Sequence, residues 1–126
     1  MTYGKLNLLG MIAVPVAAAV SALIVFGFDT DALAYIFAMN CIAVLIAGLF
    51  SGLMLRKANT PLACFVAVSP TLLPSVLVSL IYLWRAVSPA AIAPGAEYIA
   101  LPQYHILAVL LLGVLAFILG FFVRSR

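Results

Sequence analysis

Charged side chains are scarce in this chain, and their scarcity excludes most classes of soluble protein. Its 126 residues include six Lys or Arg and three Asp or Glu, so that 7% are charged while 68% are hydrophobic. Soluble domains usually carry charge on about a quarter of their residues. The composition therefore predicts an integral membrane protein.

Charge is missing altogether from four long segments, which are 6–28, 32–55, 62–83 and 103–123. Each has 21 to 24 residues, and about 20 helical residues at 1.5 Å each cross a hydrocarbon core of roughly 30 Å. The pattern predicts an all-α polytopic membrane protein, a four-helix transmembrane bundle forming one domain over 1–126. The first segment is too long for a typical signal-peptide core, so we expect it to be retained.

The basic residues fall mainly on one side of the predicted membrane. Threading four helices leaves only Arg85 on the other side, because five of the six share the first: Lys5, Arg56, Lys57, Arg124 and Arg126. Lys and Arg near helix ends are retained in the cytoplasm. We therefore expect both termini to be cytoplasmic, in a bacterial inner membrane. These residues form no stripe that would bind nucleic acid, so the lipid bilayer is the expected neighbour.

Side chains that carry reaction chemistry are nearly absent from the four segments. The segments contain no Asp, Glu, Lys or Arg, and the chain's single histidine, His105, lies at the rim of the last one. An enzyme needs a positioned nucleophile, base or metal ligand. We therefore expect no catalytic residues, no cofactor and no metal site. Cys41 and Cys64 lie too far apart along the predicted helices to form a disulfide.

Capping residues precede two of the predicted helices. Asp29 and Asp31 can cap the segment 32–55, because their carboxylates accept backbone N–H bonds and favour the positive end of the helix dipole. The two carboxylates could instead chelate a divalent cation, but without further ligands that site would be weak. Thr60 followed by Pro61 predicts an N-cap and a first helical residue for the third helix.

Three polar residues are expected to share one depth in the membrane. Ser21, Asn40 and Ser75 each lie seven or eight residues inward from the outer end of their segment, which is about 10–12 Å of helix. An unpaired amide in hydrocarbon is costly, so we expect Asn40 to face protein. The layer either joins helices to one another or lines a path for a polar substrate.

Two prolines lie inside the third segment. Pro70 and Pro74 each remove one backbone hydrogen bond and predict a kinked helix. The neighbouring hydroxyls of Ser69 and Thr71 can satisfy the carbonyls that the prolines free. The kink is either a static element of packing or a hinge in a transport path.

Small residues recur at four-residue spacing and predict faces where helices approach closely. The spacing does not show whether the facing helix belongs to this chain or to a partner. The residues are Ala17, Ser21, Gly48, Gly52, Ala116 and Gly120.

The longest gap, 84–102, contains three prolines and predicts an ordered outer loop. Its candidate contact residues are Trp84, Arg85, Glu97, Tyr98 and, at the edge, His105. We expect His105 to bond with Glu97 or a lipid headgroup, with proton sensing as the alternative. An aromatic belt at the outer interface is expected from Tyr82, Trp84, Tyr98 and Tyr104.

These features favour a small non-enzymatic membrane subunit with an accessory, assembly or inhibitory role. Such a subunit needs only packing faces, a buried amide and an ordered loop, all of which the sequence predicts. Size and topology alone also fit a membrane-embedded immunity protein. Its partner would be a larger membrane protein or further copies of the chain. The alternative is a small homo-oligomeric channel or transporter whose path is lined by the kinked third helix.

Overall fold

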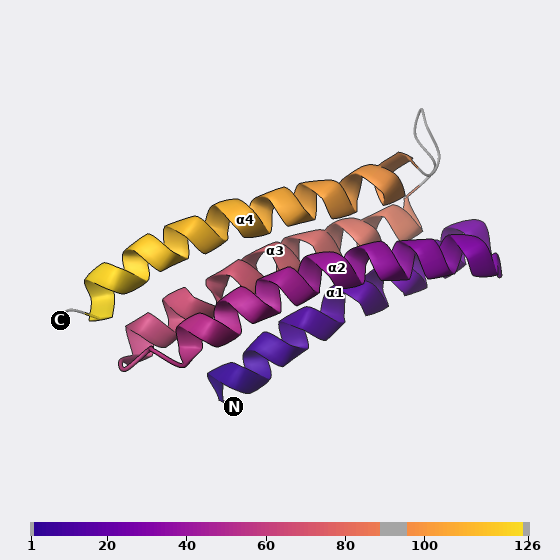
Figure 1. The fold of residues 1–126 in the computed structure, drawn as a ribbon. Coiled ribbons are helices and arrows are strands. Elements are labelled where there is room, and N and C mark those ends of the chain that lie inside the picture. The colour runs from indigo at the N-terminus through magenta and orange to yellow at the C-terminus, as the bar shows by residue number, and fades with distance from the viewer. Residues whose placement is uncertain (1, 89–95, 125–126) are drawn as a thin grey trace.

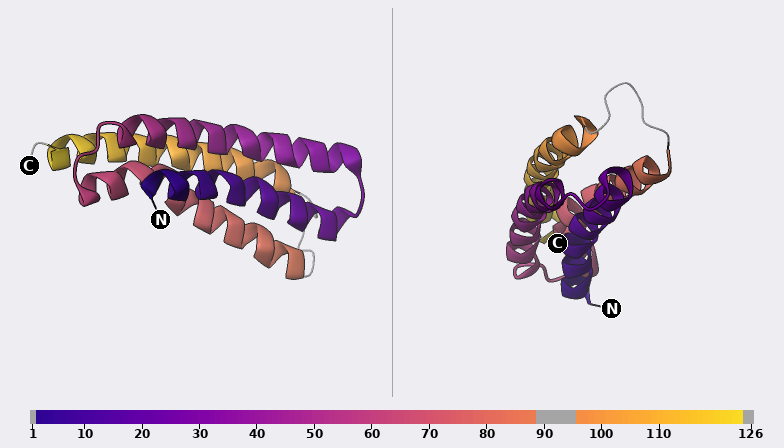
Figure 2. Two further views of the ribbon diagram at one scale, coloured as in Figure 1. Left: turned by 90° about the horizontal axis from the view of Figure 1, so that it is seen from below. Right: turned by 90° about the vertical axis from the view of Figure 1, so that its right-hand side faces the viewer.

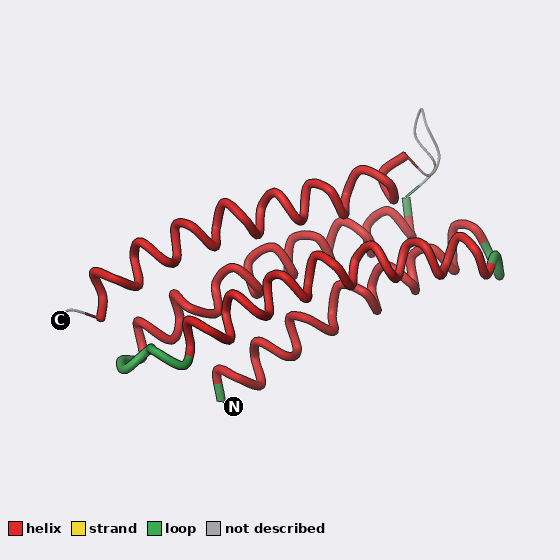
Figure 3. The backbone as a smooth tube through the Cα atoms, viewed as in Figure 1, coloured by secondary structure: helices red, strands yellow, loops and turns green. Residues whose placement is uncertain are grey.

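Four long helices make up the chain in a computed structural model that describes residues 2–88 and 96–124 (Figures 1 and 3). They are α1 (Tyr3–Phe26), α2 (Thr30–Leu55), α3 (Pro61–Val87) and α4 (Ala96–Arg124). Each is long and apolar enough to cross a membrane. The protein is therefore an all-α four-helix bundle with four candidate spans, as an integral membrane protein requires.

The helices run up and down, so that both chain ends and the α2–α3 connection lie at one end of the bundle (Figure 1). We call this the basic end, because Lys5, Arg56 and Lys57 lie there. The opposite end, which we call the far end, carries the α1–α2 turn, the end of α3 and the start of α4. Helices α2 and α3 form the centre, with α1 packed on one side of this pair and α4 on the other (Figure 2).

Local chemistry explains where α2 and α3 begin. The Asp29 side chain accepts hydrogen bonds from the backbone N–H groups of Asp31 and Ala32, each at 3.2 Å. Thr60 caps α3 through a 3.1 Å bond from the Ala63 N–H, with Pro61 as the first helical residue. Both predicted caps are confirmed. The tight turn before Asp29 depends on Gly27, whose φ of 70° lies in a region that side chains disfavour.

The far end is more helical than the sequence suggested. Helix α3 continues to Val87 and α4 begins at Ala96, so Trp84, Arg85 and Tyr98 belong to helices rather than to a loop. A single Arg does not end a helix, because a cation in the last turn favours the negative end of the dipole. The remainder of the expected ordered loop, residues 89–95, lies outside the described residues.

Helix α3 remains one helix through both of its internal prolines. Pro70 lacks the N–H that would bond the Val66 carbonyl, and the Ser69 hydroxyl donates to that carbonyl instead, at 2.7 Å. The Ser69 hydroxyl thus takes the place of the backbone donor that Pro70 lacks.

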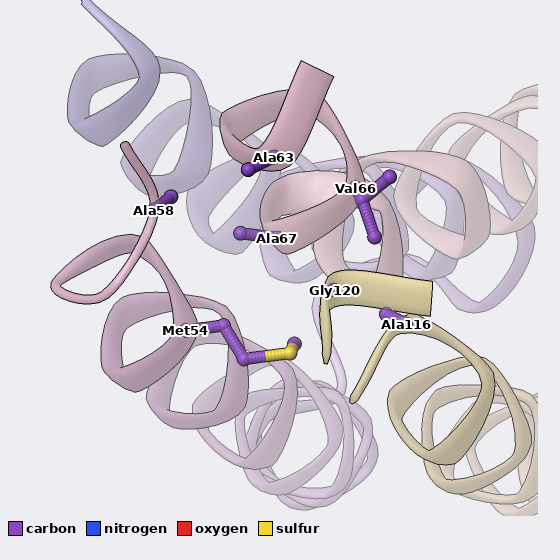
Figure 4. Close-up of a pocket in the computed structure, with 7 residues that line it drawn as sticks. All are labelled: Met54, Ala58, Ala63, Val66, Ala67, Ala116 and Gly120. Atoms are coloured by element: carbon purple, nitrogen blue, oxygen red, sulfur yellow. The ribbon is translucent and has the colours of Figure 1, made fainter. Parts of the chain in front are cut away.

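Small residues let the helices approach closely. Met11 of α1 lies directly over Gly48 of α2, where an added side chain would force the Met11 side chain to shift. Between α3 and α4, the buried Ala67 and Ala116 leave a cavity of about 10 Å³, enough for one water at most (Figure 4). The bundle interior is therefore closely packed at both of these crossings.

Candidate functional site

The most developed polar feature is a network near the far end, to which each helix contributes one side chain. The four residues are Ser21 of α1, Asn40 of α2, Tyr82 of α3 and Tyr98 of α4, none of them more than 2% exposed. The Asn40 amide nitrogen lies 2.9 Å from the Tyr82 hydroxyl, and that hydroxyl donates to the amide oxygen at 3.1 Å. The same amide nitrogen donates to the Ile36 carbonyl at 2.8 Å. Asn40 therefore faces protein and not lipid.

Ser21 extends this network to the two outer helices. Its hydroxyl donates to the Tyr82 backbone carbonyl at 2.7 Å and lies 2.6 Å from the Tyr98 hydroxyl. Since the Ser21 hydrogen is used on that carbonyl, the Tyr98 hydroxyl must be the donor to Ser21. Tyr82 takes part in both groups of hydrogen bonds, with its hydroxyl toward Asn40 and its backbone carbonyl toward Ser21, and so connects all four helices.

Aromatic rings enclose these hydrogen bonds. The Tyr98 ring centre lies 5.1 Å from that of Phe26, edge to face, and 5.6 Å from that of Tyr82. The expectation that Tyr82 and Tyr98 belong to an interfacial belt is therefore wrong, because their hydroxyls find buried partners and their rings join the core. Trp84 and Tyr104 are about two-thirds exposed, as belt residues would be.

Ser75 does not belong to this layer. Its hydroxyl donates to the Gly10 carbonyl at 2.7 Å, and Gly10 precedes Ser21 by 11 residues, or about 16 Å of helix. The predicted common depth is wrong, because the prediction takes Leu83 as the outer end of the third helix, whereas α3 continues to Val87. Ser75 instead joins α3 to α1 nearer the middle of the bundle.

Two ionisable side chains, His105 and Arg85, are buried in the half of the bundle toward the far end. His105 is 1% exposed, and neither of its ring nitrogens has a hydrogen-bond partner. The expected bond from His105 to Glu97 is wrong, since eight residues of helix separate the two by about 12 Å. Arg85, 7% exposed, donates through Nη1 to the Ser88 carbonyl at 3.3 Å. The Glu97 side chain lies outside the described part of the chain.

The predicted packing faces are used mostly within the chain. Gly48 is covered by Met11, and its carbonyl accepts a 3.3 Å bond from the Asn7 amide. Ala17 of α1 is buried in the hydrophobic core of the bundle, and Ala116 and Gly120 of α4 face α3. Gly52 has open space where a side chain would project. The Gly48 face therefore serves the α1–α2 crossing and is not available to a partner.

Polar side chains in the bundle interior form hydrogen bonds between and within helices. Within residues 2–88 and 96–124, no three His, Cys, Asp or Glu side chains gather closely enough to hold a metal ion. The Asp29 carboxylate is engaged with two backbone N–H groups. Nearer the basic end, the Thr71 hydroxyl donates to Ser51 at 2.9 Å. These polar side chains hold helices together.

A groove on the membrane-facing surface was not foreseen from the sequence. It lies between α1 and α2, has a volume of about 270 Å³ and is almost wholly apolar. We call it the α1–α2 groove. One wall carries Leu8, Ile12 and Val16, and the other carries Phe37, Cys41 and Leu45. Each wall is a row of residues four apart, which is how ridges form on helix surfaces.

Comparison of the chain with protein families, curated proteins and solved structures finds no match.

Proposed function

We propose that this chain is a non-enzymatic membrane subunit, with an accessory, assembly or inhibitory role, that binds a transmembrane helix of a larger protein in the α1–α2 groove. The observation that carries the proposal is the groove itself, which is apolar and lies at membrane depth. A channel or carrier would instead need polar groups facing a path. The polar groups of Ser21, Asn40 and Tyr82 are bonded to one another inside the chain.

The shape of the groove favours a helix as its occupant. Two parallel rows at four-residue spacing leave a channel into which a third row of side chains can interdigitate. Helix association in lipid depends on such close packing, because the lipid tails are as apolar as the side chains. Cys41 stands at the middle of its row, and its small side chain deepens the groove there.

The test is a groove-filling substitution. The chain is purified from its native membrane in mild detergent, and the mass of the intact complex is measured by native mass spectrometry. We expect a complex with a second protein that is lost in Cys41→Trp. The matched control is Leu111→Trp, which adds the same side chain at a position on α4 that is 60% exposed and remote from the groove.

The opposite results favour the alternative function. A homo-oligomer that keeps the same number of subunits in Cys41→Trp would contradict binding of a partner helix in the groove. Reconstitution of the pure chain in liposomes completes the test, because a subunit of this kind should move no ion or solute above background. Saturable flux that disappears in Asn40→Leu would support a homo-oligomeric channel or transporter instead.

A further inference from the structure

A second groove lies between α2 and α4 at the basic end, with a volume of about 400 Å³. We call it the α2–α4 groove. Its lining combines four apolar side chains with two cations: Phe50, Leu53, Met54 and Phe117, then Arg56 and Lys57. This combination distinguishes it from the α1–α2 groove, whose lining is wholly uncharged.

The cations and the apolar side chains lie at different depths of the groove. Arg56 and Lys57 follow the last turn of α2 and are exposed. Phe50 lies six residues earlier, or about 9 Å deeper along the helix. Its ring packs 3.5 Å from the position that a side chain on Gly113 of α4 would take, so it closes the inner end. The groove therefore opens at its cations and becomes apolar toward the membrane interior.

None of the chain's acidic side chains belongs to the basic end, where these cations lie. The chain's three acidic residues are Asp29, Asp31 and Glu97, and all three lie at the start of α2 or α4, at the far end. Arg56 and Lys57 stand on adjacent residues, so their positive charges also repel one another. An anion from outside the chain would relieve that repulsion.

We propose that the α2–α4 groove binds one anionic phospholipid. The lipid phosphate lies between Arg56 and Lys57, since Arg offers planar paired donors to phosphate and Lys adds a mobile point charge. An acyl chain follows the groove past Leu53 and Phe117, which are 61% and 58% exposed to the membrane. Basic pockets between membrane helices are suited to lipid headgroups for this reason. This site is distinct from the proposed helix-binding groove on the other side of α2.

The experiment measures lipid binding to the full chain by native mass spectrometry in mild detergent. The probes are phosphatidylglycerol and phosphatidylcholine with identical acyl chains. We expect the first molecule of phosphatidylglycerol to bind more tightly than the first molecule of phosphatidylcholine. Arg56→Gln and Lys57→Gln should each weaken the affinity for phosphatidylglycerol about fivefold. The matched control is Lys5→Gln, which removes one exposed cation at the same end of the bundle but outside the groove.

A second pair of variants tests the acyl-chain portion. Phe117→Ala removes an apolar wall of the groove and should weaken phosphatidylglycerol binding. Phe121→Ala removes an exposed ring of α4 that lies outside the groove and should leave phosphatidylglycerol binding unchanged. Far-UV circular dichroism of every variant should match that of the parent chain, so that a loss of binding is not a loss of fold.

Three results would overturn the proposal. Equal binding of the two lipids would show that the cations select no headgroup. Equal weakening by Lys5→Gln and Arg56→Gln would indicate general surface charge instead of a site. Displacement of the lipid by millimolar inorganic phosphate would indicate an anion site without acyl-chain recognition.

Discussion

The side-chain amide of Asn40 engages the Tyr82 hydroxyl with both of its polar atoms, nitrogen at 2.9 Å and oxygen at 3.1 Å. Both residues are at most 1% exposed, so neither lipid nor water can replace the contact. The pair joins the two central helices, α2 and α3, on which the outer helices pack. The free energy of this contact therefore contributes to the stability of the whole bundle.

We expect Tyr82→Phe to lower the free energy of unfolding by about 1–2 kcal/mol, because both polar atoms of the buried Asn40 amide lose the hydroxyl that they contact. A double-mutant cycle with Asn40→Leu should give a coupling energy of about 0.6–1.7 kcal/mol. Unfolding in mixed micelles by sodium dodecyl sulfate measures both. Tyr104→Phe, at a position 68% exposed, is the control and should have little effect. Additive losses would show that the two side chains act separately.

Ser69→Ala should destabilise α3 by about 1 kcal/mol, because the Val66 carbonyl would lose the hydroxyl that replaces its backbone partner. In a Pro70→Ala background the loss should nearly vanish, since residue 70 then supplies the missing N–H. The same unfolding assay compares the two backgrounds. An equal loss in both would mean that Ser69 does not compensate for the proline.

Gly48→Ala should destabilise the bundle by about 1–3 kcal/mol, because the added methyl group would meet the Met11 side chain. Gly52→Ala, four residues along α2, should be nearly neutral, since nothing lies within 4 Å of its new methyl group. Met11→Ala should recover part of the loss in the Gly48 variant. Equal stabilities of the two glycine variants would contradict the close α1–α2 crossing.

His105→Leu should raise the free energy of unfolding by about 1 kcal/mol, whereas Asn40→Leu should lower it, because Asn40 loses its hydrogen bonds to Tyr82 and Ile36. Both positions are buried, but the ring nitrogens of His105 have no hydrogen-bond partner, and burying such groups is unfavourable. Thermal unfolding in detergent ranks the two variants against the parent. A clear loss of stability in His105→Leu would reveal a favourable interaction of the imidazole.

Accessibility labelling tests which end of the bundle is cytoplasmic. In a Cys41→Ala, Cys64→Ala background, an impermeant maleimide added outside intact cells should label Phe28→Cys at the far end and spare Asn59→Cys at the basic end. Both positions are exposed, and the basic residues favour a cytoplasmic basic end. The reverse labelling would place the termini outside.

The sequence was informative wherever one residue determines one feature. The absence of charge defines the four spans, and the side chains of Asp29 and Thr60 determine where α2 and α3 start. A carboxylate or hydroxyl beside a helix start needs no tertiary structure to act as a cap. The burial of Asn40 could likewise be foreseen, because an amide in hydrocarbon needs a partner.

The rest depends on how the helices rotate about their axes. In a soluble bundle the polar face of each helix shows this rotation, but here the core-facing and lipid-facing sides are both apolar. The α1–α2 groove and the burial of His105 could therefore not be foreseen. The sequence does hold one signal for the burial of the two tyrosines. Tyr82 follows Ser75 by seven residues, and Tyr98 precedes His105 by seven, so each tyrosine shares a helix face with a polar residue of its own helix.

The hydrogen bond from Tyr98 to Ser21 joins α4 to α1, two helices that make few contacts besides this bond and the packing of the Tyr98 ring on Phe26. A chain truncated before Tyr98 would keep the contacts of α1 with α2 and α3. It would leave the Ser21 hydroxyl oxygen without its phenol donor and the Phe26 ring without its aromatic neighbour. The loss of the fourth helix would therefore be detectable at the first, as an incompletely satisfied serine.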